Sequence, residues 1–181
     1  DLYRSRLITA PSVTEESPFV YHQVEGDFKD ISGKCPIAEI EKTVSLAIDH
    51  LKNNPNESLG VIALGSDHAR SLYKEFQRQS ENLSLQLWPE NKPEEKFIIR
   101  HLENVQGDER DVIFLSTGYG PRKHDAVRLD FGPINSDKNL FGLRRLNVAI
   151  TRSRKRLEVI STIDPYRYDD NKLNKIGLKA F

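Results

Sequence analysis

Residues 59–64 form a continuous apolar run, Leu-Gly-Val-Ile-Ala-Leu. Such a run, bounded by polar residues, is short for a helix. It is typical of parallel strands that are buried on both faces of a sheet. Residues 97–99 and 112–115 repeat the pattern. The chain is therefore predicted to build a buried, mostly parallel sheet.

Helices are predicted between these strands. Pro36 precedes a helix over 37–51, whose apolar positions recur at helical spacing. Ser66 is the expected N-cap of a second helix over 67–79. The remaining strands are predicted at 19–24, 97–100, 112–116 and 156–161. This alternation indicates an α/β fold, a doubly wound and mostly parallel sheet with helices on both faces.

The composition is that of a globular chain of one domain. Of 181 residues, 37% are apolar and 30% are charged, which suits an ordinary packed core. No apolar run approaches the roughly 20 residues of a membrane-spanning helix, so no membrane partner is expected. The one cysteine, Cys35, excludes an internal disulfide and a cysteine-based zinc cluster, and the five histidines are too scattered for a metal site. This cysteine usage fits a reducing compartment, and we expect a cytoplasmic protein.

Three segments are expected along the chain. Residues 1–17 are predicted to be an irregular entry segment, residues 18–163 the domain, and residues 164–181 a polar tail or linker. Residue 1 is Asp and no signal-peptide pattern follows it. We therefore expect the chain to continue from an upstream region of a longer protein.

Residues 144–156 carry six Arg or Lys and no acidic residue, although the 27 basic and 27 acidic residues of the chain cancel. Because the net charge is zero, nucleic-acid binding can be argued only from such local clusters. Apolar residues at helical spacing, Leu146, Ala149 and Ile150 among them, predict a buried-face helix that enters a strand, with Arg152 near the helix end. A solvated rim is the simplest interpretation of residues 154–156.

A second informative segment is 106–111, Gln-Gly-Asp-Glu-Arg-Asp, between two predicted strands. Taken alone, it is explained equally well as a charged connection. Its acids are not a magnesium box, because such acids follow an apolar strand and these precede one. Gly33-Lys34 is not a phosphate-binding loop either, because Phe28 stands where that loop needs Gly.

Together, residues 106–109 and 144–152 resemble motifs V and VI of the superfamily 1 helicases, in the same order and separated by a loop. Residues 59–66 resemble motif IV. The form of 103–111, followed by Gly-Tyr-Gly-Pro at 118–121, is most similar to large bacterial helicases of the 1B branch, related to the RNA-decay and replication helicases. The resemblance implies a RecA-like doubly wound sheet, the second such domain of a helicase.

The resemblance also implies an enzyme that is complete only in its parent protein. The parent would hydrolyse ATP and move along or unwind single-stranded DNA or RNA. ATP and Mg²⁺ would be bound mainly by a first RecA-like domain that these residues do not include, so this chain alone would be inactive. The alternative is a degenerate, non-catalytic module that docks protein or nucleic acid. Retention of Gln106, Gly107, Glu109 and Arg152 argues against it.

The resemblance assigns nucleotide-facing roles. Arg152 matches the catalytic arginine of motif VI, an arginine finger that reaches the γ-phosphate. Gly107 and Glu109 match motif V, and the alternative for Glu109 is to order the motif VI arginines. Arg145 is assigned either to the nucleotide or to a structural ion pair with acids of 108–111. Without nucleotide, Arg152 is expected to pair with an acid of that segment.

Single-stranded nucleic acid in this family crosses both RecA-like domains and is held through its phosphates. By their match to motifs IV and V, the candidate contacts lie at the predicted carboxyl ends of strands, where ligands bind in open α/β sheets. They are Ser66, His68, Asn104, Thr117 and Gly118. For Ser66, the N-cap role is equally supported.

Overall fold

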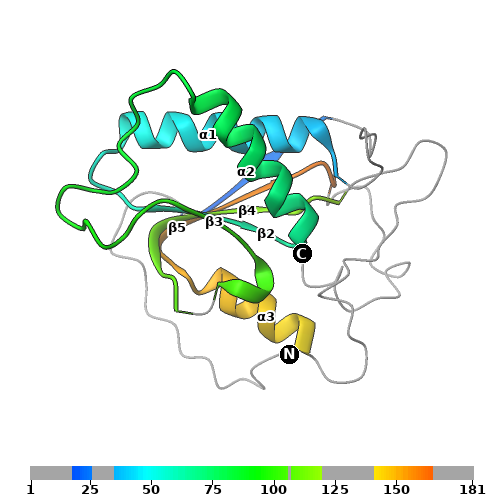
Figure 1. The fold of residues 1–181 in the computed structure, drawn as a ribbon. Helices are drawn as coiled ribbons and strands as arrows, with labels where there is room; N and C mark the ends of the chain where they lie inside the picture. Colours follow the sequence, from blue (N-terminus) through cyan, green and yellow to red (C-terminus); the bar gives the residue numbers. More distant parts are fainter. Residues whose placement is uncertain (1–17, 26–34, 106, 120–140, 165–181) are drawn as a thin grey trace.

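The computed structural model describes residues 18–25, 35–105, 107–119 and 141–164, with side chains described from Arg144 in the last range. Figure 1 shows one α/β sheet with helices above and below it. The elements are β1 (Phe19–Gln23), α1 (Ile37–Asn53), β2 (Leu59–Ala63), α2 (Ser66–Ser80), β3 (Ile98–His101), the 3-10 helix η1 (Leu102–Asn104), β4 (Arg110–Ser116), α3 (Phe141–Ile150) and β5 (Ser153–Ser161). The predictions for segment 1–17, for Gly33 and Lys34, for Gln106 and for the tail after Asp164 lie outside the described residues.

The five strands form one parallel sheet in the order β1-β5-β4-β2-β3. Pairing of β4 with β5 runs from Arg110 opposite Ser153 to Ser116 opposite Ile160. Every residue of β2 and β4 is buried. The predicted parallel, doubly wound architecture is therefore confirmed.

Alternate residues of the central strands pack into two separate cores. On the side of α1 and α2, Val61 packs in one cluster with Leu72 of α2. On the opposite side, Ile62 packs in the other cluster with Leu146 of α3. Figure 1 shows α1 and α2 above the sheet and α3 below it. Because successive side chains of a strand point to opposite faces, residues 59–64 must be apolar throughout.

Both predicted helices of the first half are present, and only the start of α2 differs. Its N-cap is Gly65, whose backbone is extended and whose carbonyl accepts the N–H of Ala69 at 3.0 Å. Ser66 is the first helical residue, so the N-cap position falls on Gly65. The capping role predicted for Ser66 is therefore wrong. Among the described helices, none combines the length and apolar character that a membrane-spanning helix requires.

The basic segment forms the junction between α3 and β5, as predicted for a helix that enters a strand. α3 ends at Ile150, and β5 begins at Ser153, three residues before the predicted start at 156, because Ser153 pairs with Arg110 of β4. Ile150 is 40% exposed, whereas Leu146 and Ala149 are buried. The expectation that Ile150 belongs to the buried face is therefore wrong.

Among the described residues, two glycines have a positive φ, Gly107 at 91° and Gly118 at 69°. They differ in their surroundings. A Cβ atom on Gly118 would lie 2.6 Å from Cγ of His68, whereas a Cβ on Gly107 would meet nothing within 4 Å. The buried His68 ring therefore depends on the missing side chain of Gly118.

Gly118→Ala is expected to lower the free energy of unfolding more than Gly107→Ala does. Each variant places alanine in left-handed backbone, which costs about 1–2 kcal/mol. Only Gly118→Ala adds an overlap with a buried ring, worth about a further 1–3 kcal/mol. Urea unfolding followed by circular dichroism measures both losses. Equal losses would contradict the packing of His68 against Gly118.

Candidate functional site

The candidate residues fall at opposite ends of the same two strands. Glu109 immediately precedes β4 and Arg152 immediately precedes β5, so both lie at what we call the amino edge of the sheet. Residues 116–119 and 161–163, where these strands end, form the carboxyl edge. The seven residues of β4 separate the edges by about 20 Å. Unlike the nucleic-acid candidates Thr117 and Gly118, Glu109 lies at the amino edge, because η1 and the turn after it return the chain from the end of β3 to the start of β4.

At the amino edge, Arg152 pairs with Glu109, with Nη1 3.4 Å from Oε1. This ion pair is the one expected from the sequence. The carbonyl of Arg152 accepts the N–H of Arg110 at 3.0 Å, which fixes the two backbones relative to each other. Nε of Arg152 donates to the carbonyl of Val148 at 3.1 Å, near the C-terminus of α3.

The pair between Arg152 and Glu109 lies at the surface. The Arg152 side chain is 21% exposed and that of Glu109 is 51% exposed. Ion pairs with this exposure contribute at most about 1 kcal/mol, because water and salt screen them. The arrangement is therefore a permanently charged, planar guanidinium that is held weakly and can bind an incoming oxyanion.

Arg145 does not join this pair. Its Nη1 lies 2.9 Å from Oε1 of Glu103 in η1, and both side chains are about half exposed. The alternative that Arg145 pairs with an acid of 108–111 is wrong, because η1 packs against α3 and its Glu103 is the carboxylate that Arg145 meets. Asp108 instead lies 3.9 Å from Arg100. The nucleotide role of Arg145 stays a prediction.

An ionic cluster centred on the buried Asp111 lies at the same edge. The carboxylate of Asp111, 2% exposed, accepts hydrogen bonds from Nζ of Lys92 at 2.7 and 2.8 Å. Nη2 of Arg154 lies 3.2 Å from the same carboxylate and also pairs with Glu95. The hydroxyl of Ser58 donates to Glu95. This cluster connects the first residues of β4 and β5 to the segments before β2 and β3.

The solvated rim expected at residues 154–156 is present in part. Arg154 and Lys155 are exposed and Arg156 is half-buried, but each pairs with an acid: Arg154 with Asp111 at 3.2 Å, Lys155 with Glu57 at 2.9 Å and Arg156 with Glu158 at 2.7 Å. The early start of β5 places these side chains beside the acids of neighbouring segments. The excess of positive charge in this segment is therefore largely neutralised within the fold.

Asp111 and Glu95 have lowered pKa values. For each, burial alone would raise the pKa, but hydrogen bonds to the ionised form outweigh it. Lys92 and the backbone N–H of Ser58 lower the pKa of Asp111, and Arg154 and the Ser58 hydroxyl lower that of Glu95. A lowered folded-state pKa stabilises the fold above the unfolded value, and this contribution is lost as the pH falls through the folded value.

The structure divides the five nucleic-acid candidates by exposure. Ser66 and Asn104 are exposed, whereas His68, Thr117 and Gly118 are buried. A direct phosphate contact therefore does not fit the three buried residues, because their polar atoms face the interior of the sheet edge.

Glu39 of α1 lies at the centre of this buried group. Its side chain is fully buried, and its carboxylate accepts the backbone N–H of Gly118 at 2.6 Å and that of Thr162 at 3.3 Å. The hydroxyls of Ser116, at 2.8 Å, and of Thr117, at 3.2 and 3.3 Å, donate to it as well. Glu39 could not be identified from the sequence, because a glutamate in an amphipathic helix gives no signal that distinguishes it from a solvent-facing residue.

His68 extends this group into α2. Its Nε2 lies 2.7 Å from Oγ of Ser116 and 3.5 Å from Oε1 of Glu39. The single hydroxyl proton of Ser116 goes to Glu39, so Nε2 must carry the proton that it donates to Ser116. Nδ1 is then a buried acceptor without a hydrogen-bond partner. Ser116 is fully buried and its proton faces a carboxylate, so these residues are not a nucleophile and its base.

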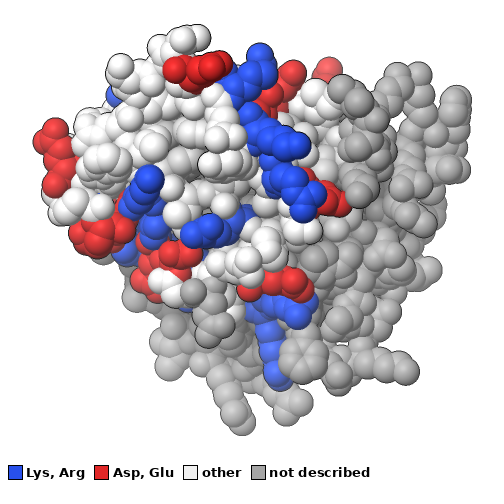
Figure 2. Space-filling model, in the orientation of Figure 1, with Lys and Arg blue, Asp and Glu red and all other residues white. Residues whose placement is uncertain are grey.

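Other ligand classes find little support in the described residues. No three His, Cys, Asp or Glu side chains there come together as a metal site. Figure 2 shows Lys and Arg in a row over the face that carries α2, with acidic side chains beside them. Arg70 pairs with Asp67 and Arg78 pairs with Glu75, so this row is partly neutralised by its own helix.

The parallel sheet covered on both faces, with a weakly held surface arginine at the start of β5, has the form of a RecA-like domain. Comparison with protein families agrees, because the model of a family described as "AAA domain" matches residues 2–164. The match spans most of the chain, which therefore belongs to this family and is a RecA-like domain of the superfamily 1 helicase kind.

Two curated relatives match at similar levels. An uncharacterized ATP-dependent helicase, MG140 of Mycoplasma genitalium, is 34% identical over 131 residues, which cover 70% of this chain and 11% of the relative. Its homolog in Mycoplasma pneumoniae is 34% identical over 127 residues, which cover 68% and 11%. The chain thus spans about a tenth of the length of these relatives.

Among solved structures, the C-terminal domain of a possible DNA helicase from Lactobacillus plantarum WCFS1 is similar to this chain. The TM-score is 0.45 and the sequence identity is 12%. The similarity covers 79% of this chain and 71% of the other.

Asp111→Asn is expected to destabilise the fold by about 3 kcal/mol at pH 7, because Lys92 and Arg154 lose a buried anionic partner. The difference from wild type should shrink below about pH 4, because protonation of Asp111 then weakens the same ion pairs in the wild type. Urea unfolding at several pH values measures this difference in the free energy of unfolding.

The matched control is Asp67→Asn, which removes an exposed carboxylate paired with Arg70 on α2. For this variant, little change in the free energy of unfolding is expected at pH 7 or at pH 3. A destabilisation by Asp111→Asn that stays constant from pH 7 to pH 3 would contradict the ionic cluster.

Proposed function

We propose that residues 18–163 are the second RecA-like domain of an ATP-dependent helicase or translocase and supply its arginine finger, Arg152. The observation that carries this proposal is the ion pair between Arg152 and Glu109, which joins the two resembling motifs at one surface. The names of the curated relatives, ATP-dependent helicases, support ATP use by the parent protein.

Arg152 has the properties that an arginine finger requires. Its guanidinium is always charged, and its planar fork matches the oxygens of a phosphoryl group. Since its pair with Glu109 is weak, an oxygen that gains negative charge in the transition state would compete for it. The backbone hydrogen bond from Arg110 holds the main chain in place, so only the side chain has to turn.

The residues at the amino edge fit a nucleotide better than a metal ion. Gly107 leaves open space for close approach, and Glu109 is a carboxylate suited to a ribose hydroxyl once Arg152 has moved. Among the described residues, no group of three His, Cys, Asp or Glu side chains comes together to hold a metal ion. We therefore assign Mg²⁺ and most of the ATP contacts to the first RecA-like domain of the same parent chain.

Single-stranded nucleic acid is assigned to the carboxyl edge, where Ser66 is exposed, and to the exposed Asn104 of η1. The two edges are the ends of β4 and β5, which are hydrogen-bonded along their length. If ATP binding or hydrolysis at the amino edge moves this domain, the nucleic-acid surface at the carboxyl edge therefore moves with it as one rigid body. The single cysteine, Cys35, supports a cytoplasmic location.

In the full-length protein, Arg152→Ala is expected to lower the turnover of ATP by about 10³- to 10⁵-fold, because the arginine acts on charge that develops in the transition state. ATP binding should largely survive. Steady-state hydrolysis and equilibrium binding of a fluorescent ATP analogue measure the two quantities separately.

The control for this variant is Arg78→Ala, which removes an exposed arginine paired with Glu75 on α2 and should leave turnover unchanged. An Arg152→Ala protein that hydrolyses ATP like the control would contradict the finger. A different wild-type result would favour the non-catalytic docking module. In that case the protein binds single strands, its affinity for them does not change when ATP is added, and it shows no ATP turnover.

The purified 181-residue chain is expected to show no ATP hydrolysis above a protein-free blank, with or without single strands. The reason is that its finger has no phosphate-binding loop to act upon. A colorimetric phosphate assay measures this. Strand-stimulated turnover by the pure chain would contradict the division of the site between two domains.

A further inference from the structure

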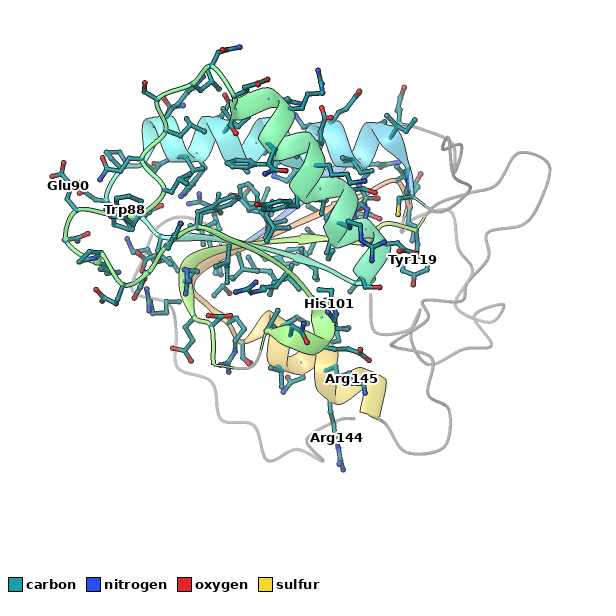
Figure 3. The ribbon with its side chains drawn as sticks, in the orientation of Figure 1. Trp88, Glu90, His101, Tyr119, Arg144 and Arg145 are labelled. Carbon is teal, nitrogen blue, oxygen red and sulfur yellow. The ribbon has the colours of Figure 1, made fainter. Side chains whose placement is uncertain are left out.

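The carboxyl edge has two surface elements that lie side by side. One is the first turn of α2, with the exposed Ser66. The other is the half-buried Tyr119, which Figure 3 places at the end of the sheet where α2 begins, away from Trp88 and Glu90. A Cβ on Gly65 would lie 4.0 Å from the hydroxyl oxygen of Tyr119, so the two elements are adjacent.

Glu39 fixes the backbone of Tyr119 indirectly, through hydrogen bonds to two other residues. Its carboxylate binds the N–H groups of Gly118 and Thr162, at 2.6 and 3.3 Å. The hydroxyl of Thr162 then donates to the carbonyl of Tyr119 at 3.0 Å. The backbone of Tyr119 is therefore fixed through two residues that both depend on one buried carboxylate.

Glu39 also holds the first turn of α2. The hydroxyl of Ser116 donates to Glu39 at 2.8 Å and accepts Nε2–H of His68 at 2.7 Å. His68 stands two residues after Ser66 in the same helical turn. A single side chain of α1 thus sets the position of α2 relative to the ends of β4 and β5.

We propose that Glu39 is a positioning residue for single-stranded nucleic acid. It fixes the spacing between Tyr119, whose ring can stack on a base, and Ser66, whose hydroxyl can bond a phosphate. The inference rests on the proposed function and deepens it, because it states how the buried residues of the carboxyl edge contribute to binding.

The cluster requires a carboxylate and not merely a polar side chain. Both oxygens of Glu39 accept backbone N–H groups, Oε1 from Gly118 and Oε2 from Thr162. A glutamine has one carbonyl oxygen, and its amide NH₂ would face the other N–H group. Glu39→Gln therefore leaves a buried donor unpaired with almost no change in volume, and the turn has to move.

The test uses the full-length protein and two probes, a dT oligonucleotide and a U oligonucleotide. Glu39→Gln is expected to raise the strand concentration for half-maximal stimulation of ATP hydrolysis about tenfold. The KM for ATP and the turnover without strand should stay within about twofold of wild type, since the amino edge is untouched. A general loss of folding would lower turnover and leave the half-maximal strand concentration unchanged.

The matched control is Glu158→Gln, which also replaces a buried carboxylate but lies within β5, paired with His22 and Arg156. If Glu39→Gln does not fold, Ser116→Ala replaces it, because it removes one oxygen atom and disconnects His68 from Glu39. The half-maximal strand concentration is then expected to rise about threefold.

Two results overturn the positioning role while the proposed function stands. One is the same half-maximal strand concentration for the Glu39 and Glu158 variants. The other is a fall in ATP turnover without a shift in that concentration. A wild-type protein whose ATP hydrolysis ignores both oligonucleotides overturns the proposed function, and the positioning role with it.

Discussion

The pairing of β4 with β5 at the centre of a parallel sheet is the constraint on which the rest of the structure depends. β4 is buried at every residue, so its charged first residues, Arg110 and Asp111, must find partners inside the fold. The guanidinium of Arg110 donates to the carbonyls of Lys96 and Glu109, and Asp111 binds Lys92 and Arg154. These contacts fix where β4 and β5 begin, and so they fix Glu109 and Arg152 as neighbours.

The two edges of the sheet differ in physical character. At the amino edge, Arg152 is bound by a half-exposed carboxylate and by the carbonyl of Val148 at the helix end, and the ion pair is weak because water screens it. At the carboxyl edge, Glu39 is fully buried and accepts hydrogen bonds from backbone N–H groups of Gly118 and Thr162. An exchangeable arginine at one edge and a rigid cluster at the other are the two features on which the proposed function rests.

The helices and strands were predictable from the sequence, because the patterns of apolar residues that indicate them are local. The apolar run at 59–64 and the helical spacing over 37–51 each report burial that any compact fold of this chain must satisfy. The neighbouring positions of Glu109 and Arg152 were also predictable, since both belong to segments that resemble known motifs. Burial of single polar residues such as His68 and Thr117 was not predictable, because it depends on segments that are distant along the chain.

By itself, the sequence determined a parallel α/β sheet covered on both faces and an arginine, Arg152, at the junction between its last helix and its last strand. Only the tertiary structure decided that the two groups of candidates lie at opposite edges, because it shows where the connection between β3 and β4 crosses from one edge of the sheet to the other. It also decided the role of Glu39. The donors to that carboxylate come from β4, from the end of β5 and, through Ser116, from α2, and no local pattern in α1 records their approach.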